Sequence, residues 1–447
     1  MKTHYLKLEK DLPFNPKDYS SILNHAKRLI GKSLIQLVGA TEAKTSYSGK
    51  GGFGNKVEEK YFFIQNNSDS SPDFKEVGVE LKITPIKLLK QGSFSPKERL
   101  VLGKIDYNEL NKENDFLKSK FIVKNNKILI IFYLHTPSTK DYDYEFKHLV
   151  TYELLKSDLK IIQDDWIKIR DKVRVGKAHL LSESDTIYLA ASTKGKNSSD
   201  RTSQPNGPSA KPRAFSFKPS FIKTLLTDFL IKDGESVLKG IKSKKTFEEI
   251  VIDKFNSYIG KTEVALKSIF NISYSKSAKH KGYLIAKAIL GVSKKFISEF
   301  EKGGIVVKTI TLKETGAIKE SMSFKQIQYP EIIKEDWEET DLYEVLSSRF
   351  FLIVFQLNKS GIPVLKKVKF WNMPEKDLET VRKVWVDTQK KIKKGVFDKF
   401  IKISDNKIAH VRPKAQNKDD KMIDANGSLQ DKKCFWLNAS YVNEMIK

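Results

Sequence analysis

The sequence is poor in cysteine and has no long apolar segment, and each absence excludes a class of protein. Cys434 is the single cysteine among 447 residues, so an internal disulfide cannot form and a cysteine-based zinc cluster is excluded. The longest apolar runs, residues 128–134 and 350–355, have the length of a strand and are far too short to span a bilayer. The N-terminal segment has no apolar core of the kind found in signal peptides. We therefore expect a cytoplasmic protein without a membrane-spanning segment.

Positive charge is in large excess. Lys and Arg number 81 against 55 Asp and Glu, which gives a formal net charge of +26. Folding does not require this excess, but a polyanionic partner does, because each basic side chain that neutralises a phosphate releases condensed counterions. The seven histidines include no His-x-x-x-His pair, which argues against a zinc site. The composition favours nucleic acid as the partner, and a soluble protein from a Lys-rich proteome is the alternative.

The chain repeats itself at long period. Residues 29–32 (Leu-Ile-Gly-Lys) recur as residues 258–261 (Tyr-Ile-Gly-Lys), 229 positions later. Trp166 recurs as Trp385, 219 positions later. Further matches fall between these two pairs in the same order, with intermediate spacings. A shared order with slowly drifting spacing indicates a duplicated domain rather than chance.

The repeat defines two expected domains, residues 1–232 and residues 240–447. The polar stretch 232–236 contains a glycine and is the expected junction. Each domain should be α/β, with a small mixed sheet flanked by helices. The Ser-, Asn-, Gly- and Pro-rich stretch 195–213 should be a long loop inside the first domain. In that domain the periodicity predicts a helix near 22–30, strands near 77–84 and 127–134, a helix near 160–174, and a strand and loop near 187–196.

One segment carries a candidate constellation for chemistry. From residue 77 to residue 84 the chain alternates, with branched apolar side chains on one face and Glu80 and Lys82 on the other. A carboxylate and an ammonium group are thus about 7 Å apart along one face of a strand. Asp73 follows Pro72, at a point where a turn can bring its carboxylate back toward the strand.

Phosphodiester hydrolysis uses this set of groups. The carboxylate oxygens of Asp73 and Glu80 are hard ligands that suit Mg²⁺, which stabilises charge on the scissile phosphate and acidifies a bound water. The ammonium group of Lys82 can orient that water and stabilise the transition state. The pattern alone has little specificity in a chain so rich in Lys and Glu. A surface strand with solvated charges is the alternative.

The context of the pattern adds specificity. Pro-Asp, six residues and Glu-x-Lys, within Gly-Val-Glu-Leu-Lys-x-Thr-Pro, resembles the MutH family of GATC-specific nicking endonucleases of mismatch repair. The whole chain resembles still more the GATC-cutting type II restriction endonucleases that carry two MutH-like domains in tandem. This resemblance implies a restriction-endonuclease-like core in each domain and dependence on Mg²⁺. It also implies a cut before the G of GATC that leaves 5′ overhangs with 5′-phosphate and 3′-hydroxyl ends.

The resemblance implies further active-site residues. Residues 50–58 resemble the family's Gly-x-x-x-Glu helix, which places Glu58 in the site, with the adjacent Glu59 as the alternative. Lys124, before the predicted strand 127–134, matches the region of the family's second active-site lysine. The expected catalytic set is therefore Glu58, Asp73, Glu80, Lys82 and Lys124, with Asp73 and Glu80 as metal ligands.

The second copy has lost most of this set. Val306 and Ala286 stand where the first copy has its carboxylates Glu80 and Glu58. Lys308 remains at the position of Lys82. Glu299 precedes Val306 as Asp73 precedes Glu80, but one carboxylate cannot rebuild the metal clamp. We expect the second domain to be catalytically inactive.

Both copies have candidate base-reading residues. The resemblance places Thr193 and Lys194 in the base-reading loop of the first copy. In the second copy, residues 410–414 keep an Arg-Pro-Lys pattern, and we expect Arg412 and Lys414 to contact DNA, since Arg and Lys reach guanine from the major groove. A scaffold without DNA contact is the alternative for the second domain.

The expected partner is double-stranded DNA containing GATC. Each chain has one active centre and GATC is a palindrome, so two chains should dimerise on the site, with the second domain as an effector that binds another site. The resemblance also implies a companion DNA methyltransferase in the host. The alternatives are a MutH-type nicking enzyme and a DNA-binding protein without catalysis, and metal-dependent cleavage of a plasmid discriminates between them.

Overall fold

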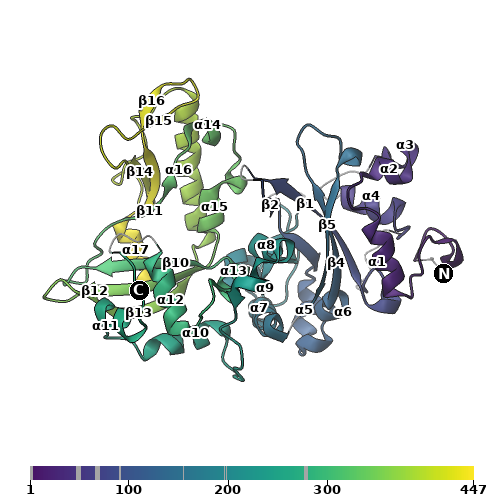
Figure 1. The fold of residues 1–447 in the computed structure, drawn as a ribbon, viewed down its shortest axis with the longest axis horizontal. Helices are drawn as coiled ribbons and strands as arrows, with labels where there is room; N and C mark the ends of the chain where they lie inside the picture. Colours follow the sequence, from purple (N-terminus) through teal and green to yellow (C-terminus); the bar gives the residue numbers. More distant parts are fainter. Residues whose placement is uncertain are drawn as a thin grey trace. The chain divides into compact units, whose positions relative to one another are not determined.

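The computed structural model describes residues 4–46, 52–65, 71–89, 92–154, 156–195, 197, 199–275 and 280–447. Residues 50 and 51 of the predicted Gly-x-x-x-Glu helix lie outside this description. The chain forms two compact units, whose elements are labelled in Figure 1. The first unit comprises Met1–Leu181, Thr186–Gly234 and Glu301–Gly303, and the second comprises Ser182–Asp185, Glu235–Phe300 and Gly304–Lys447.

The first unit contains seven described strands and nine described α-helices. The strands are β1 (Glu80–Leu88), β2 (Phe94–Pro96), β3 (Leu100–Lys104), β4 (Lys127–Leu134), β5 (Phe146–Glu153), β6 (Leu189–Thr193) and β7 (Arg213–Phe217). The helices are α1 (Tyr19–Lys27), α2 (Leu34–Val38), α3 (Ala40–Ala43), α4 (Gly52–Lys60), α5 (Tyr107–Lys112), α6 (Lys120–Asn125), α7 (Lys156–Arg174), α8 (Pro219–Thr227) and α9 (Phe229–Asp233).

The short strand β8 (Gly234–Glu235) follows, and the remaining elements complete the chain. The strands are β9 (Phe296–Ile297), β10 (Val306–Leu312), β11 (Met322–Gln326), β12 (Phe350–Leu357), β13 (Pro363–Trp371), β14 (Ala409–Pro413), β15 (Lys421–Ile423), β16 (Leu429–Asp431) and β17 (Lys433–Leu437). The helices are α10 (Phe247–Asn256), α11 (Glu263–Ile269), α12 (Lys281–Leu290), α13 (Ser298–Gly303), α14 (Tyr329–Ile332), α15 (Asp341–Leu346), α16 (Glu375–Lys393) and α17 (Ala439–Ile446).

The first unit is built on a four-stranded mixed sheet of order β2-β1-β4-β5, in which β1 runs parallel to β4 and the other pairs are antiparallel. Helices α1 and α4 pack on one face, where Leu81, Leu129 and Ile131 join a cluster of buried aromatic side chains. A three-stranded sheet of order β3-β7-β6 completes the unit. Because β4 is buried centrally, it reads in the sequence as a near-continuous apolar run.

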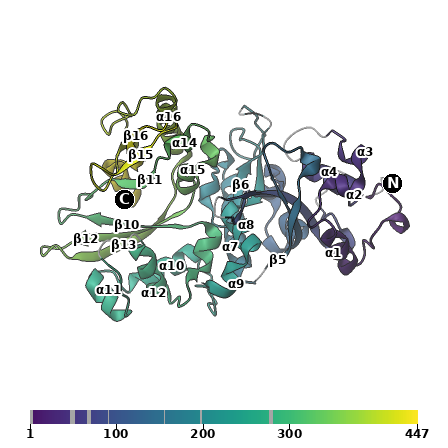
Figure 2. The ribbon, with the colours of Figure 1, turned by 45° about the horizontal axis from the view of Figure 1, so that its top comes forward.

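The second unit repeats this plan. Its first sheet has the order β10-β12-β13, in which β10 runs parallel to β12 as β1 does to β4, and β13 runs antiparallel to β12. Its second sheet has the order β11-β17-β14. Helices α10, α11 and α12 lie along one face of the first sheet (Figure 2). On that face Phe351 contacts Phe255, with ring centroids 5.2 Å apart. Phe350, Leu352 and Val354 point to the opposite face and join the core cluster with α16 and the second sheet.

The duplication extends to irregular features. The β4–β5 pair shifts register between Phe132 and Tyr133, and the β12–β13 pair shifts between Val354 and Phe355. Ile128 of β4 pairs with Glu80, and Phe350 of β12 pairs with Val306. The two register shifts lie equally far along the strand from these two residues. A β-bulge adds a residue to one strand and redirects the strand beyond it. The two units are therefore copies of one fold in detail as well as in element order.

The strand predicted near 77–84 begins later than expected. Residues Lys75–Val77 form a 3₁₀ turn, Gly78 has φ +64°, and β1 starts at Glu80 and continues to Leu88. A positive φ suits glycine and does not occur in an extended strand. Val77 and Val79 therefore belong to the turn before β1, and their alternation does not mark a strand. The predicted strand 127–134 is confirmed as β4, and the helix predicted near 160–174 is α7, which starts at Lys156.

In the part of the chain that the structure describes, no helix combines the length and the apolar character needed to cross a bilayer.

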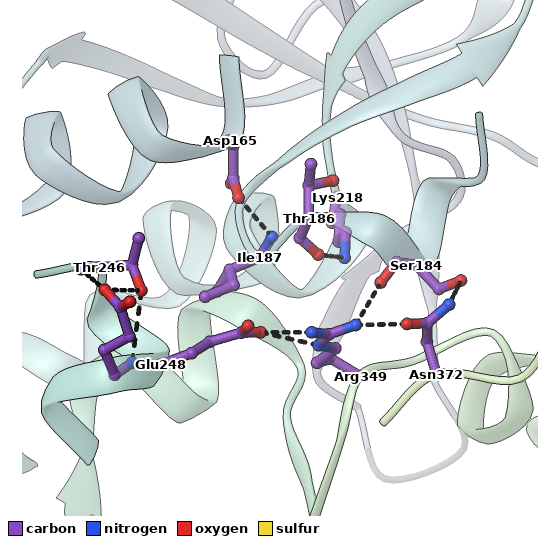
Figure 3. Close-up of polar contacts among 10 residues, drawn as sticks. Asp165, Ser184, Thr186, Ile187, Lys218, Thr246, Glu248, Arg349 and Asn372 are labelled. Carbon is purple, nitrogen blue, oxygen red and sulfur yellow. Dashed lines mark hydrogen bonds and ion pairs between the residues drawn. The ribbon is translucent and has the colours of Figure 1, made fainter. Parts of the chain in front are cut away.

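A buried carboxyl group in the first unit and a partly buried guanidinium group in the second organise the ends of core elements (Figure 3). Asp165 of α7 is fully buried and accepts hydrogen bonds from the backbone N–H groups of Ile187, Tyr188 and Leu189, at 2.8, 2.7 and 3.0 Å. Burial raises the pKa of this carboxyl to about 6. In the second unit Arg349, directly before β12, donates to Glu248 of α10 at 2.8 Å. Both groups fix where a core strand starts.

Replacing Asp165 with Ala should destabilise the first unit. Three buried N–H groups would lose their acceptor, and an unsatisfied buried donor costs about 1–3 kcal/mol, so we expect a loss of about 3 kcal/mol or more. The measurement is urea unfolding followed by circular dichroism. Asp171→Ala, at an exposed position on the same helix, is the matched control and should change stability by less than about 0.5 kcal/mol. Equal transitions for the two variants would refute the anchoring role of Asp165.

Candidate active site

Helix α4 positions Glu58. Phe53 and Val57 are buried against the sheet, and the Phe53 ring stacks on Phe146 of β5 at 5.9 Å. Lys56, on the same helix, is buried and forms a 2.8 Å ion pair with Asp141. These contacts fix the helix on the sheet and direct Glu58 toward the charges of Asp73, Glu80 and the site lysines, which all act on its pKa.

A closed turn positions Asp73. Phe74 and Val79 bond to each other through their backbones, with N–O distances of 2.9 and 3.2 Å, so the chain folds back before β1 begins. The Phe74 ring is fully buried and contacts Phe14 and Phe62. The carboxylate of Asp73 returns to the strand, where its Oδ2 accepts a 2.9 Å hydrogen bond from the N–H of Leu81. The turn expected after Pro72 is present.

Glu80 lies at the centre of the cluster. It is the first residue of β1 and is 1% exposed. Its Oε2 accepts a 3.2 Å hydrogen bond from the N–H of Asp73, and its Oε1 forms an ion pair with Lys82. The Nζ of Lys124 lies 3.4 Å from the same Oε1 and donates to the carbonyl of Ser71 at 3.0 Å. The structure therefore brings Asp73, Glu80, Lys82 and Lys124 together through hydrogen bonds and ion pairs and places Glu58 within electrostatic reach.

Burial and mutual repulsion shift the pKa values of the carboxyl groups. Burial raises the pKa of Glu58 to about 8, and the charge of Asp73 adds to the effect. Burial also raises the pKa of Glu80 to about 6, although Lys82 and Lys124 oppose the shift. Burial lowers the pKa of Lys82, but the three carboxylates outweigh it and hold the ammonium protonated, with a pKa above its usual value. The two lysines thus leave the carboxylates only partly neutralised.

This charge imbalance bears on metal binding. Within the described residues, no three His, Cys, Asp or Glu side chains converge closely enough to enclose a metal ion by themselves. Mg²⁺ does not need such an enclosure, because it keeps several waters and is often held by one or two carboxylates together with substrate phosphate oxygens. Asp73 and Glu80 supply hard oxygen ligands at one point, and a divalent cation would offset their repulsion. The donor set fits such an ion.

Sequence reasoning missed one residue of this region. The Nε2 of His4 donates a hydrogen bond to the carbonyl oxygen of Asp73 at 2.5 Å. The backbone of the same segment pairs with the chain after α4, through Leu6 with Phe63 and Gln65 with His4. His4 is 69 residues from Asp73 and belongs to no motif, so no spacing or periodicity in the sequence could have identified it.

The residues predicted to read bases in the first copy lie elsewhere in the unit. Thr193 ends β6, and both Thr193 and Lys194 have exposed side chains. The backbone N–H of Lys194 bonds to the carbonyl of Pro212 at 2.8 Å, which ties the two ends of the loop 195–213 together. The structure therefore places these two residues where the loop 195–213 begins.

The second unit has the same scaffold with different side chains. Val306 begins β10 as Glu80 begins β1, and Ala286 is fully buried on α12. Glu299 is 3% exposed and bonds to the start of the second unit, accepting from the N–H of Val237 at 3.0 Å and from the hydroxyl of Ser236. Its carboxylate is thus bonded to the segment that opens the second unit, whereas that of Asp73 bonds to β1.

The predicted DNA-contacting residues of the second unit lie on and just after β14. Arg412 is exposed, and its guanidinium carbon is 3.9 Å from the centroid of the Trp436 ring. Lys414 donates from Nζ to the hydroxyl of Ser323 at 2.9 Å and to the carbonyl of Phe324 at 2.6 Å. His410 is buried and bonds to Asn438 at 2.6 Å, which suits a structural role.

Comparison with known proteins identifies relatives of both units. A family model described as "DNA mismatch repair enzyme MutH" matches residues 62–165 and 292–383. The first matched segment contains Asp73, Glu80, Lys82 and Lys124, and the second contains Val306 and Lys308. "Type II restriction enzyme Sau3AI" of Staphylococcus aureus is 36% identical over 486 aligned residues, which cover 96% of this chain and 98% of that enzyme.

Proposed function

The chain belongs to the MutH-like type II restriction endonucleases, and from this premise we propose that it hydrolyses both strands of DNA at GATC with Mg²⁺ as cofactor. The cut falls before the G and leaves 5′ overhangs. Residues 1–232 form the catalytic domain in this proposal, and residues 240–447 form an inactive domain that binds DNA. The observation that carries the proposal is the buried convergence of Asp73, Glu80, Lys82 and Lys124 at the start of β1.

Each group in the cluster has a distinct role in this proposal. Asp73 and Glu80 hold the metal, and Glu58 supports the site from α4. Bound Mg²⁺ supplies Lewis acidity at the scissile phosphate and acidifies a water. The Glu80 carboxylate holds the Lys82 ammonium beside the site, where it orients the attacking water and stabilises charge in the transition state. Lys124, fixed by the Ser71 carbonyl and near the same Glu80 oxygen as Lys82, donates to the phosphate.

Binding and assembly follow from the same arrangement. Thr193 and Lys194, exposed at the base of a loop, contact bases in the first domain, and Arg412 and Lys414 do so in the second. One chain carries one complete catalytic set, whereas a palindromic site presents two equivalent bonds. Two chains therefore dimerise on the DNA, with the second domain as an effector. A companion methyltransferase protects the host DNA in the cytoplasm.

The function is tested by digestion of an unmethylated plasmid of known sequence with purified protein, in Mg²⁺ and in EDTA, followed by sequencing of the fragment ends. We expect discrete fragments that begin with GATC in Mg²⁺ and intact plasmid in EDTA. Nicked circles without linear products would instead identify a MutH-type nicking enzyme. A gel shift without cleavage in either tube would leave a DNA-binding protein without catalysis and would refute the proposed hydrolysis.

Replacing Glu80 with Ala should separate cleavage from binding. The variant loses a metal ligand and the partner of Lys82, so we expect the cleavage rate to fall at least about a thousandfold. DNA affinity should be unchanged or higher, because a charge that repels phosphate is removed. Single-turnover cleavage and fluorescence anisotropy measure the two quantities. Glu76→Ala, an exposed carboxylate in the same turn, is the matched control and should cleave normally. A fully active Glu80→Ala variant would remove Glu80 from the mechanism.

Replacing His4 with Ala should weaken the metal site without removing a ligand. Groups that orient a metal ligand from outside the coordination shell typically contribute about ten- to a hundredfold in affinity or activity. We expect a loss in this range, with the Mg²⁺ titration of the cleavage rate displaced to higher concentration. His4→Gln keeps a donor for the Asp73 carbonyl and should restore much of the loss. Equal loss in both variants, without a displaced titration, would mean that His4 only stabilises the fold.

A further inference from the structure

Lys308 keeps its catalytic position in a unit that has lost its carboxylates. It is the third residue of β10 and pairs with Leu352, as Lys82 is the third residue of β1 and pairs with Ile130. In the first unit the Lys82 ammonium forms an ion pair with Glu80. In the second unit Val306 occupies the equivalent place, so the partner carboxylate is missing. The half-buried ammonium group of Lys308 therefore lacks the carboxylate that pairs with Lys82 in the first unit.

Other cations approach the same place. The Lys308 Nζ is 5.6 Å from the centroid of the Phe324 ring, and the Lys414 Nζ donates to the carbonyl of that same Phe324. Arg412 lies two residues from Lys414 on the same face of the chain. Both reach the Trp436 ring, at 3.9 Å for Arg412 and 5.8 Å for Lys414. We name Lys308, Arg412 and Lys414, with the two aromatic rings between them, the cationic strip.

The charge of the strip is unbalanced. Among the residues that the structure describes, no ion pair joins Lys308, Arg412 or Lys414 to a carboxylate. Burial lowers the pKa of Lys308, and the nearby charge of Lys414 lowers it further. Removing an ammonium group from water without a counterion is costly. A surface of this composition is stabilised by a bound anion. The hydrogen bonds that the Lys414 ammonium makes among the described residues go to neutral groups, the Ser323 hydroxyl and the Phe324 carbonyl.

We propose that the cationic strip binds a backbone phosphodiester of DNA. Lys308 contacts this phosphate from the position that corresponds to Lys82, which faces the scissile phosphate in the first unit. The second unit thus binds a phosphate at the place where the catalytic unit does, but it uses ammonium and guanidinium groups instead of a metal ion. This inference rests on the proposed function, because it takes double-stranded DNA as the ligand. Beyond that function, the inference specifies that the second unit binds a phosphodiester and that Lys308 contacts it. Lys308 stands at the motif position that is associated with catalysis in the family.

The absence of metal ligands makes the proposal distinctive. Val306 and Ala286 cannot coordinate a cation, and Glu299 is occupied by Ser236 and Val237. Mg²⁺ requires hard oxygen ligands, which this position lacks in the second unit. Arg and Lys bind phosphate without a metal, by charge-assisted hydrogen bonds. Phosphate binding at the strip is therefore independent of Mg²⁺, whereas metal-dependent contacts in the first unit are lost in EDTA.

The experiment uses the full-length Glu80→Ala chain, which we expect not to cleave, in EDTA. Fluorescence anisotropy gives its affinity for a labelled GATC duplex across a series of salt concentrations. Each phosphate contact contributes about 0.9 to the slope of log K against log salt. Adding Lys308→Met should reduce the slope by about that amount, and adding Lys308→Arg should leave it unchanged. Lys376→Met, at an exposed position at the start of α16, is the matched loss of one charge and should retain the parental slope.

A second measurement needs no substitution at Lys308. The Glu80→Ala chain is treated briefly with an amine-acylating reagent, with and without the duplex, and the modified lysines are mapped by mass spectrometry. The duplex should protect Lys308 and leave Lys376 reactive. Equal acylation of Lys308 with and without DNA would overturn the proposal, as would an unchanged salt slope in Lys308→Met.

The outcomes also distinguish this inference from the proposed function. If Arg412→Ala and Lys414→Ala weaken binding while Lys308→Met does not, the second unit binds DNA but Lys308 holds no phosphate, and only this inference fails. If none of the three substitutions changes affinity or salt slope, DNA binding by the second domain fails with it, while plasmid cleavage still reports on the first domain. If the intact chain neither binds nor cuts GATC DNA, the proposed function itself is refuted.

Discussion

The parallel pairing of β1 with β4 determines where the groups of the candidate site lie. Glu80 pairs with Ile128, so the first residue of β1 lies beside the end of α6, and Lys124 reaches it from there. On the other side the Phe74–Val79 backbone pair closes the turn and returns Asp73 to Leu81. The approach of Lys124 to Glu80 depends on the register of the β1–β4 pairing. A shift of one residue would turn Glu80 toward the opposite face of the sheet and separate it from Lys124.

The cluster is costly to the unit that contains it. Three carboxylates and two ammonium groups share a largely buried place, and the raised pKa values of Glu58 and Glu80 record how poorly the carboxylates are neutralised. Aromatic packing around Phe74, outside the charged region, supplies the compensating stability. The second unit has removed that cost by placing Val306 and Ala286 in the same scaffold. Burial of the Lys308 ammonium, with the charge of Lys414 nearby, is the cost that it retains.

Much of this arrangement could be predicted from the sequence. The duplicated order of motifs and the apolar run at β4 depend on local pattern, and the motif placed Asp73, Glu80 and Lys82 near one another. The start of β1 was predicted three residues too early, because alternation at Val77 and Val79 continues through a turn that only the positive φ of Gly78 reveals. His4 and the approach of Lys414 to Lys308 depend on contacts between segments distant in the sequence. No periodicity within a segment reports such contacts.

The repeated β-bulge has a consequence for measurement. Because β5 and β13 depart from regular pairing at matching positions, the two sheets bend alike, and corresponding side chains start from equivalent backbones. One polypeptide thus contains the same scaffold twice, once with the charged cluster and once without its carboxylates. Both copies are in the same solvent and at the same concentration. Comparing local hydrogen exchange along β1 with that along β10 would report, inside a single molecule, how much rigidity a protein gives up in order to hold reactive charges.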